Sequence, residues 1–78
     1  MSLVIDARGH RCPLPSLRLR KAMEGQPPGT FLTLLATDPM ARIDVPYLMT
    51  ELGGAVASIE DIEGMLRITV VTPDAPPG

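Results

Sequence analysis

The sequence predicts an α+β domain in which strands and helices follow one another in the order β-α-β-α-β-β. The chain has 78 residues, enough for one small domain. Short apolar runs alternate with segments of helical periodicity in the first two thirds of the chain, and two further apolar runs joined by a turn follow. We therefore expect a four-stranded mixed sheet with two helices on one face. This single domain should cover residues 1–72, and residues 73–78 should form a flexible tail.

The first half of the chain holds two strands and a helix. The aliphatic run Leu3–Ile5 predicts the first strand, and residues 6–11 form a loop. A helix is predicted over Pro13–Met23, because proline is tolerated in the first turn of a helix. The glycines and prolines of residues 25–29 end this helix. The nearly continuous apolar run Phe31–Ala36 is typical of a central strand.

A second helix is predicted to end near Leu52, where the pair Gly53–Gly54 follows. Asp38 and Pro39 have the pattern of a cap and a first-turn proline. Pro46 removes a backbone hydrogen bond, so we expect the regular helix to start near Asp44 after an irregular turn over Pro39–Arg42. The apolar positions that share one helical face are Ala41, Val45, Leu48 and Leu52.

The last third of the chain predicts a hairpin. Val56–Ile62 and Leu66–Val71 have the composition of strands, and Glu63–Gly64 lies between them as a turn. The sheet face without helices would stay open and is a candidate contact surface.

Composition bounds the class of protein. The hydrophobic fraction is 45% and the mean hydropathy is +0.19, which is typical of a folded domain. No apolar run is long enough to span a membrane, and no signal peptide is visible at the N-terminus. One cysteine cannot form an internal disulfide, so we expect a cytoplasmic protein without membrane contact.

That single cysteine, Cys12, lies where the first helix is predicted to start. With Pro13 as the first helical residue, Cys12 is the N-cap and its sulfur meets the free N–H groups of the first turn. Such a position favours the thiolate, which is the nucleophilic form. Pro13 and Pro15 would set the start of the helix. His10 could hydrogen-bond the sulfur or could be an exposed loop histidine.

Basic residues gather on both sides of Cys12, although the net charge of the chain is −2. Five of the seven basic residues lie here without an intervening acid: Arg8, Arg11, Arg18, Arg20 and Lys21. They would favour the thiolate and attract an acidic partner, or they form an ordinary solvated helix face. Leu14 and Leu17 fall away from the predicted core face, so they are either docking contacts or ordinary surface leucines.

Several kinds of chemistry are disfavoured. A Cys-His hydrolase would need an orienting third residue, a structural zinc site would need four ligands, and a thioredoxin-type motif would need a second cysteine. No glycine-rich phosphate loop is present. What remains is a thiol that holds a group and passes it on. A persulfide is the natural cargo of such a thiol.

The sequence resembles the small TusA-like (SirA/YedF) sulfur-carrier proteins from about residue 3 to residue 71. The central feature of the resemblance is the Cys-Pro-x-Pro element. The matching segments are Asp6-Ala7-Arg8-Gly9, Arg11-Cys12-Pro13-Leu14-Pro15, Arg20-Lys21, Pro28-Gly29, Ala36-Thr37-Asp38-Pro39 and Asp44-Val45-Pro46.

The resemblance implies a two-layer α/β sandwich like the C-terminal domain of translation initiation factor three. It implies that Cys12 receives a sulfane sulfur from a cysteine desulfurase or a rhodanese-like donor and relays it to an acceptor protein. Family members serve tRNA thiolation, molybdenum-cofactor enzymes or sulfur metabolism. The family often has an apolar residue where His10 stands. Asp38 would act as a helix cap or would shape the carrier site.

Our hypothesis is a monomeric carrier rather than a turnover enzyme, without a cofactor or metal beyond the transient persulfide on Cys12. Arg11, Arg18, Arg20 and Lys21 would attract partners, with Leu14 and Leu17 as apolar contacts. Two alternatives treat Cys12 as incidental: an adaptor that binds proteins, and an RNA-binding domain. The isoelectric point of about 5.1 and the lack of interleaved aromatic residues argue against direct nucleic-acid binding.

Overall fold

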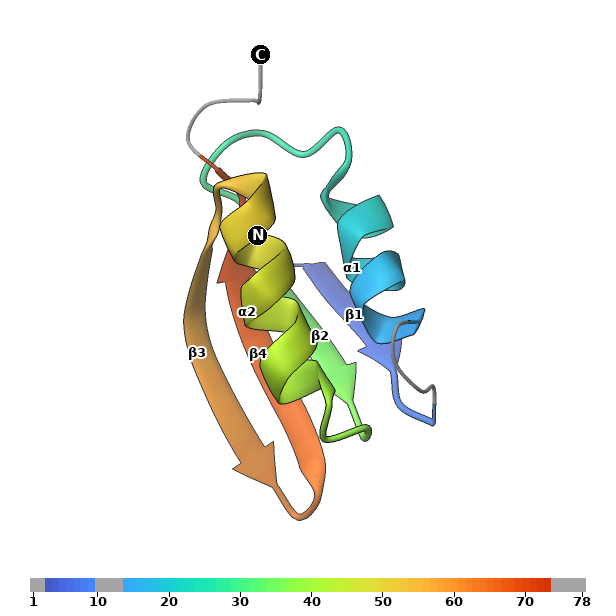
Figure 1. Cartoon of the computed structure of the whole chain (residues 1–78). Helices are drawn as coiled ribbons and strands as arrows, with labels where there is room; N and C mark the ends of the chain where they lie inside the picture. Colours follow the sequence, from blue (N-terminus) through green and yellow to red (C-terminus); the bar gives the residue numbers. More distant parts are fainter. Residues whose placement is uncertain (1–2, 10–13, 74–78) are drawn as a thin grey trace.

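Two helices cover one face of a four-stranded sheet (Figure 1). The computed structural model describes residues 3–9 and 14–73, with the backbone alone for residues 14–16. The elements in chain order are β1 (Leu3–Ala7), α1 (Leu14–Met23), β2 (Phe31–Ala36), α2 (Ala41–Leu52), β3 (Ala55–Ile62) and β4 (Met65–Val71). The predicted order and the two-layer architecture are confirmed.

The sheet is mixed, with the strand order β1-β2-β4-β3. β1 pairs in parallel with β2, whereas β4 pairs antiparallel with both β2 and β3. β2 is therefore central, and its side chains alternate between the two faces. Leu32, Leu34 and Ala36 are fully buried under the helices. Phe31, on the opposite face, is 49% exposed.

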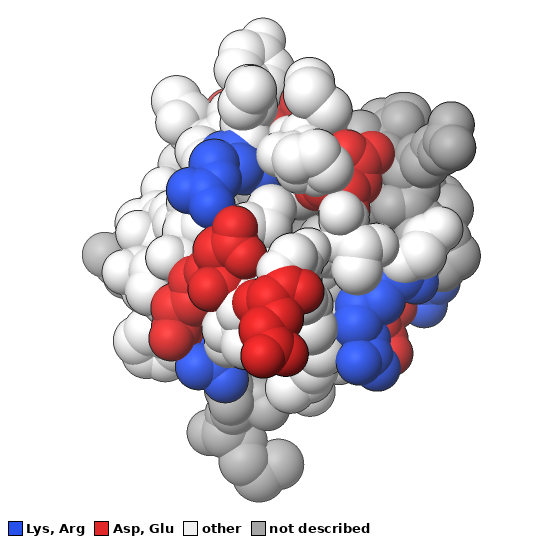
Figure 2. Space-filling view, turned by 90° about the horizontal axis from the view of Figure 1, so that it is seen from below, with Lys and Arg blue, Asp and Glu red and all other residues white. Residues whose placement is uncertain are grey.

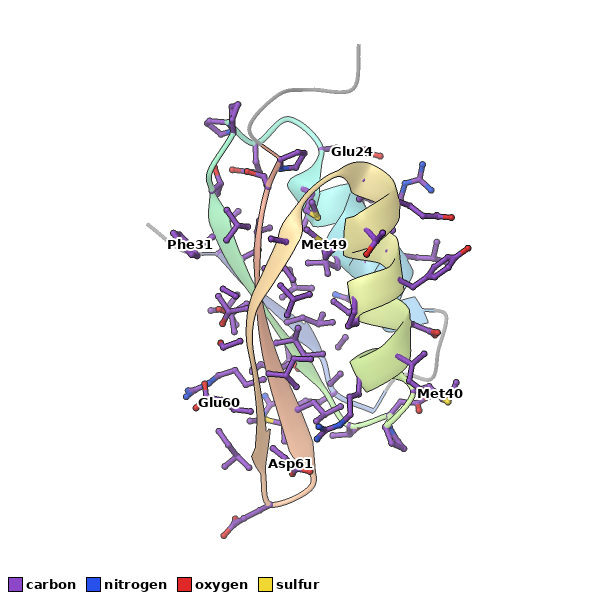
Figure 3. The ribbon with its side chains drawn as sticks, turned by 60° about the vertical axis from the view of Figure 1, so that its left-hand side comes forward. Glu24, Phe31, Met40, Met49, Glu60 and Asp61 are labelled. Atoms are coloured by element: carbon purple, nitrogen blue, oxygen red, sulfur yellow. The ribbon has the colours of Figure 1, made fainter. Side chains whose placement is uncertain are left out.

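The core lies between the helices and the sheet. Figure 3 shows Met49 between α2 and the strands, whereas Phe31 points away from both helices. The largest fully buried side chains are contributed by both helices and the two central strands: Leu19, Leu32, Leu34, Val45, Met49, Ile68 and Val70. One face of each helix is thus buried, and one face of the sheet stays open, as predicted.

Helix α1 ends at Met23, as the pattern predicts, and its first described residue is Leu14. Leu19 and Met23 lie on its buried face, whereas Leu17 is 54% exposed. The predicted exposure of Leu17 is confirmed. The predicted cap position of Cys12 lies outside the described residues.

The predicted late start of the second helix is wrong, because α2 begins at Ala41 and contains Pro46. A turn of the 3₁₀ type leads into this helix. The N–H groups of Ala41 and Ile43 each donate a hydrogen bond to the carbonyl three residues earlier. Ala41 and Val45 are fully buried, so the packing of this first turn compensates for the bond that Pro46 cannot donate.

The hairpin turn at Glu63–Gly64 is confirmed. Both residues have positive φ angles, 51° and 83°, as a two-residue type I′ turn requires. β3 carries a bulge between Val56 and Ser58, so one extra residue bends this edge strand.

Hydrogen bonds of Thr72, which is only 4% exposed, connect the end of β4 to the loop before β2. Its hydroxyl accepts a hydrogen bond from the N–H of Thr30 (2.8 Å) and donates one to the carbonyl of Pro27 (2.8 Å). Pro73, predicted as the first residue of the tail, is half-buried beside Gly53. Residues 74–78 of the predicted tail lie outside the described residues.

Candidate functional site

Cys12 itself lies outside the described residues, but the two elements that flank it in the sequence, β1 and α1, are described. β1 and β2 run in the same direction, and each is followed by a helix that returns along the sheet. The starts of α1 and α2 therefore lie at the same end of the molecule (Figure 1). Crevices beyond the carboxyl ends of parallel strands are common binding sites.

The two loops at this end are joined by a side-chain hydrogen bond. The N–H of Gly9 donates to Oγ1 of Thr37, at 2.8 Å, and so links the loop after β1 to the loop after β2. Gly9 has a φ of +82°, which glycine adopts without strain. Thr37 was not singled out as a site residue, although its segment is among those that carry the family resemblance. This bond fixes the N-terminal flank of the Cys12 segment.

Asp38 shapes the start of α2. Its Oδ1 accepts a hydrogen bond from the N–H of Met40 at 2.9 Å, as a capping carboxylate does. The N-cap of α2 is nevertheless Met40, which has no side-chain cap bond, so the prediction that Asp38 caps this helix is wrong and its carboxylate stabilises the preceding turn instead.

Arg8 is paired rather than available to Cys12. Its Nε and one terminal nitrogen donate to the two carboxylate oxygens of Asp6, at 2.9 and 2.8 Å. These bonds, the further bond from the Arg8 N–H and, more weakly, the charge of Arg18 hold the pKa of Asp6 well below its ordinary value. The same pair raises the pKa of Arg8. The positive field predicted around Cys12 therefore loses one of its five cations.

The other predicted site residues divide into three groups. His10, Arg11, Cys12 and Pro13 lie outside the described residues. The backbone of Leu14 and Pro15 forms the first turn of α1, which contains no acidic residue. The third group, from Leu17 onward, is described with its side chains.

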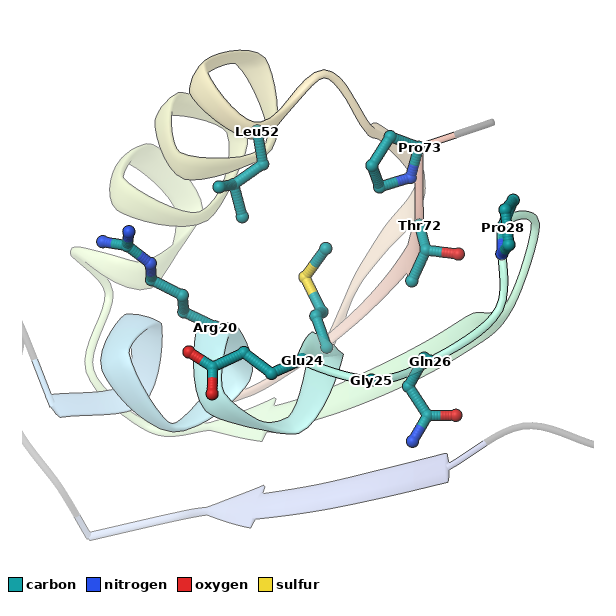
Figure 4. Close-up of a pocket in the computed structure, with 9 residues that line it drawn as sticks. Arg20, Glu24, Gly25, Gln26, Pro28, Leu52, Thr72 and Pro73 are labelled. Carbon is teal, nitrogen blue, oxygen red and sulfur yellow. The ribbon is translucent and has the colours of Figure 1, made fainter. Parts of the chain in front are cut away.

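Arg20 and Lys21 belong to the last turn of α1, away from its start. At about 1.5 Å per residue, Arg20 lies about 9 Å along the axis from Leu14, which is close to the screening length at physiological salt. Arg20 instead lines a hollow of about 460 Å³ at the C-terminal ends of both helices, together with Glu24, Leu52 and Pro73 (Figure 4). The structure thus separates Arg20 from the Cys12 end.

Acidic side chains gather in the middle of the face seen in Figure 2, with basic side chains on both sides. The β3–β4 hairpin supplies the exposed acids Glu60, Asp61 and Glu63. Glu60 pairs with Arg67 at 2.9 Å, and Asp61 with Arg42 at 3.6 Å. Much of the charge at this end is therefore compensated locally.

No group of three or more His, Cys, Asp or Glu residues in residues 3–9 and 14–73 could hold a metal ion. Within the same ranges, neither helix has the length and apolar character needed to cross a membrane.

Comparison with known proteins agrees on one family. A family model described as sulfurtransferase TusA matches residues 3–72. A candidate sulfur carrier protein from Archaeoglobus fulgidus is 42% identical over 67 residues, which is 85% of this chain and 87% of the relative. The sulfur carrier protein TusA of Pseudomonas paraeruginosa is 33% identical, over 78% of this chain and 77% of its own.

The fold has a solved counterpart. The crystal structure of a SirA-like protein from Desulfitobacterium hafniense superimposes with a TM-score of 0.81 at 27% sequence identity. The match covers 94% of this chain and 99% of that one.

Proposed function

Because the chain belongs to the TusA sulfurtransferase family of sulfur carriers, we propose that Cys12 carries a sulfane sulfur as a persulfide. The family match spans every strand and helix, and Cys12 is the only thiol in the chain. The match together with this single thiol is the observation on which the proposal depends. The carrier works in the reducing cytoplasm and relays sulfur between a donor and an acceptor protein.

The transfer is a pair of thiol exchange steps. The Cys12 thiolate attacks the terminal sulfur of a donor persulfide, a new S–S bond forms on Cys12, and the donor leaves as a thiolate. A nucleophile on the acceptor then attacks the terminal sulfur of the Cys12 persulfide and releases the Cys12 thiolate. Neither step needs an outside oxidant, because a sulfane sulfur moves from one thiol to another.

The described flanks of the segment support this chemistry. α1 begins two residues after Cys12 and has no acid in its first turn, so no carboxylate there opposes an anion at that helix end. The Gly9–Thr37 hydrogen bond holds the preceding loop. A donor such as a cysteine desulfurase or a rhodanese has to bring its own persulfide to this end.

The decisive experiment is sulfur loading followed by intact mass. The reduced protein is incubated with a cysteine desulfurase and cysteine, and a parallel sample with a rhodanese and thiosulfate. We expect a gain of one sulfur that reductant reverses and that Cys12→Ser abolishes. A matched control moves the thiol: Cys12→Ser combined with Ser58→Cys places it on an exposed strand position.

Loading of the relocated thiol to the same extent would show that the donor reacts with any exposed cysteine. No loading from either donor, with both donors active on a known carrier, would favour the adaptor alternative.

We also propose that the partners contact the exposed side of α1, around Leu17, Arg18 and the flanking Arg11, Leu14, Arg20 and Lys21. Leu17 is half exposed, so Leu17→Ser should slow loading without changing thermal stability. Ile43→Ser is the matched control, since Ile43 is a similar apolar residue, 62% exposed, on α2. Equal loss of loading in both variants would remove the assignment to α1.

A further inference from the structure

β1 is an unprotected edge of the sheet. It comes last in the strand order, so one of its backbone edges has no strand beside it within residues 3–9 and 14–73. The register of β1 with β2 is continuous from Leu3 to Ala7, without a bulge. β1 also contains no lysine, arginine or proline. Proteins commonly use such residues or bulges to block pairing at sheet edges.

The opposite edge differs in two respects, although β3 also contains no lysine, arginine or proline and β1 has one acid of its own, Asp6, which Arg8 binds. β3 is bent by its bulge between Val56 and Ser58, and it carries Glu60 and Asp61. Both devices discourage another strand from pairing there. Of the two edges, only the β1 edge is straight, and it is therefore the edge that can accept a further strand.

A groove runs beside this edge. α1 lies next to β1 (Figure 1), and between them is a depression of about 520 Å³. Its lining residues come from both elements: Val4, Ile5 and Asp6 of β1, and Arg18, Lys21 and Ala22 of α1. A strand edge beside a helix is the arrangement in which domains of the strand-addition type bind extended peptides.

The charge of the groove selects the occupant. Asp6 is its one acidic residue, and Arg8 already binds both oxygens of that carboxylate. Arg18 and Lys21 add two positive charges on the helix side of the groove. A chain lying in the groove would therefore be favoured by acidic side chains on the face turned toward α1.

We propose that the groove between β1 and α1 binds an extended, acidic segment of a partner protein, which adds to the sheet beside β1. Main-chain hydrogen bonds to β1 supply affinity, and Arg18 and Lys21 select acidic side chains at alternate positions. β1 spans five residues, so the bound segment needs about five or six. This binding requires no sulfur on Cys12, so its failure would leave the carrier proposal standing, and the reverse also holds.

The test is a titration followed by amide NMR of the isotopically labelled full chain under reducing conditions. The probe is a synthetic peptide of about six residues in which glutamate alternates with valine. We expect the largest shift changes at Leu3–Ala7 and slower exchange of the outward amide protons of β1. Arg18→Glu combined with Lys21→Glu should weaken binding about tenfold or more at low salt.

Arg42→Glu is the matched control, because Arg42 is an exposed arginine of α2 that does not line the groove. It should bind the peptide with nearly unchanged affinity. A second control uses two methylated versions of the same peptide. In each version the alternate backbone nitrogens along one edge of the extended peptide are methylated, and the two versions differ in which edge carries the methyl groups. One of the two must lose binding, because methylation removes the main-chain donors and blocks the approach to β1.

Three results would overturn the proposal. The first is an absence of shift changes in β1 at millimolar peptide. The second is equal binding of a peptide in which lysine replaces glutamate. The third is full binding by both methylated peptides, which would mean that charge alone holds the peptide and no strand is added.

Discussion

Gly54 has no room for a side chain, and Gly54→Ala should destabilise the domain severely. A Cβ built at this position lies 2.6 Å from the carbonyl oxygen of Val71, and it also overlaps Cε of Met49. The Met49 methyl is at the end of a flexible chain and can move. The Val71 carbonyl belongs to β4, between β2 and β3, so it cannot retreat without disturbing the sheet.

The expected cost is about 2–3 kcal/mol, the upper range for inserting one carbon into a packed site. A chain of this size has a total stability of about 4–12 kcal/mol. In a small domain each 1 kcal/mol lowers the melting temperature by about 4–8 °C, so a fall of about 10–20 °C is expected. Thermal and urea unfolding followed by far-ultraviolet circular dichroism measure both quantities.

Gly25→Ala separates a steric cause from a conformational one. Gly25 has a φ of +80° and no atom within 4 Å of its virtual Cβ, so alanine there costs only the left-handed backbone, about 1 kcal/mol. If Gly54→Ala lowers the free energy of unfolding no more than Gly25→Ala does, the steric clash is refuted. Full recovery of Gly54→Ala by Met49→Leu would refute the role of the Val71 carbonyl, because that change relieves only Met49.

Three further predictions concern single groups. Thr72→Val should cost about 1–3 kcal/mol in urea unfolding, because it leaves the part-buried N–H of Thr30 without its hydroxyl partner, whereas the carbonyl of Pro27 keeps its bond from the Thr30 hydroxyl; an unchanged midpoint would contradict this. Tyr47, the one tyrosine of the chain, has a pKa raised by its hydrogen bond to Glu51. Its ultraviolet titration should therefore shift to lower pH in Glu51→Gln, and an unmoved curve would exclude the bond. The lowered pKa of Asp6 makes its pair with Arg8 stabilising above the ordinary carboxyl value of 3.8, and that stability is lost as the pH falls toward the folded pKa. Asp6→Asn should accordingly be less stable than the parent at neutral pH but not at strongly acidic pH, and an equal difference at both would be inconsistent with the pair.

The strands were predictable because their apolar runs end at turn residues. β2 matches its predicted bounds, and the Glu63–Gly64 turn follows from the glycine and the flanking β-branched residues. The start of α2 was not predictable from the proline rule. That rule weighs a single missing hydrogen bond, whereas Ala41 and Val45 gain burial that depends on the whole fold.

The electrostatics of the site were less accessible to sequence reasoning than its location. The lack of acids between Arg8 and Lys21 suggested a continuous positive region around Cys12. Asp6 lies just before that stretch of sequence, and at the end of β1 its carboxylate forms an ion pair with Arg8. Lys21 is near Cys12 in sequence, but the rise of the helix carries it to the far end of α1. The unprotected edge of β1 follows only from the strand order, which distant pairings decide.

The pairing of β1 with one strand only also affects how the domain unfolds. Leu3 pairs with Leu32, far along the chain, whereas Ile62 pairs with nearby Met65. The β3–β4 hairpin can thus close early, and β1 with α1 docks onto a sheet that is already built. An element held along one side only is an expected unit of sub-global unfolding. The segment of Cys12 follows β1 and precedes α1 in the sequence, so release of this pair would loosen both of the elements that flank it while the remaining three strands stay paired. Native-state hydrogen exchange would show it as weaker protection of β1 than of β4.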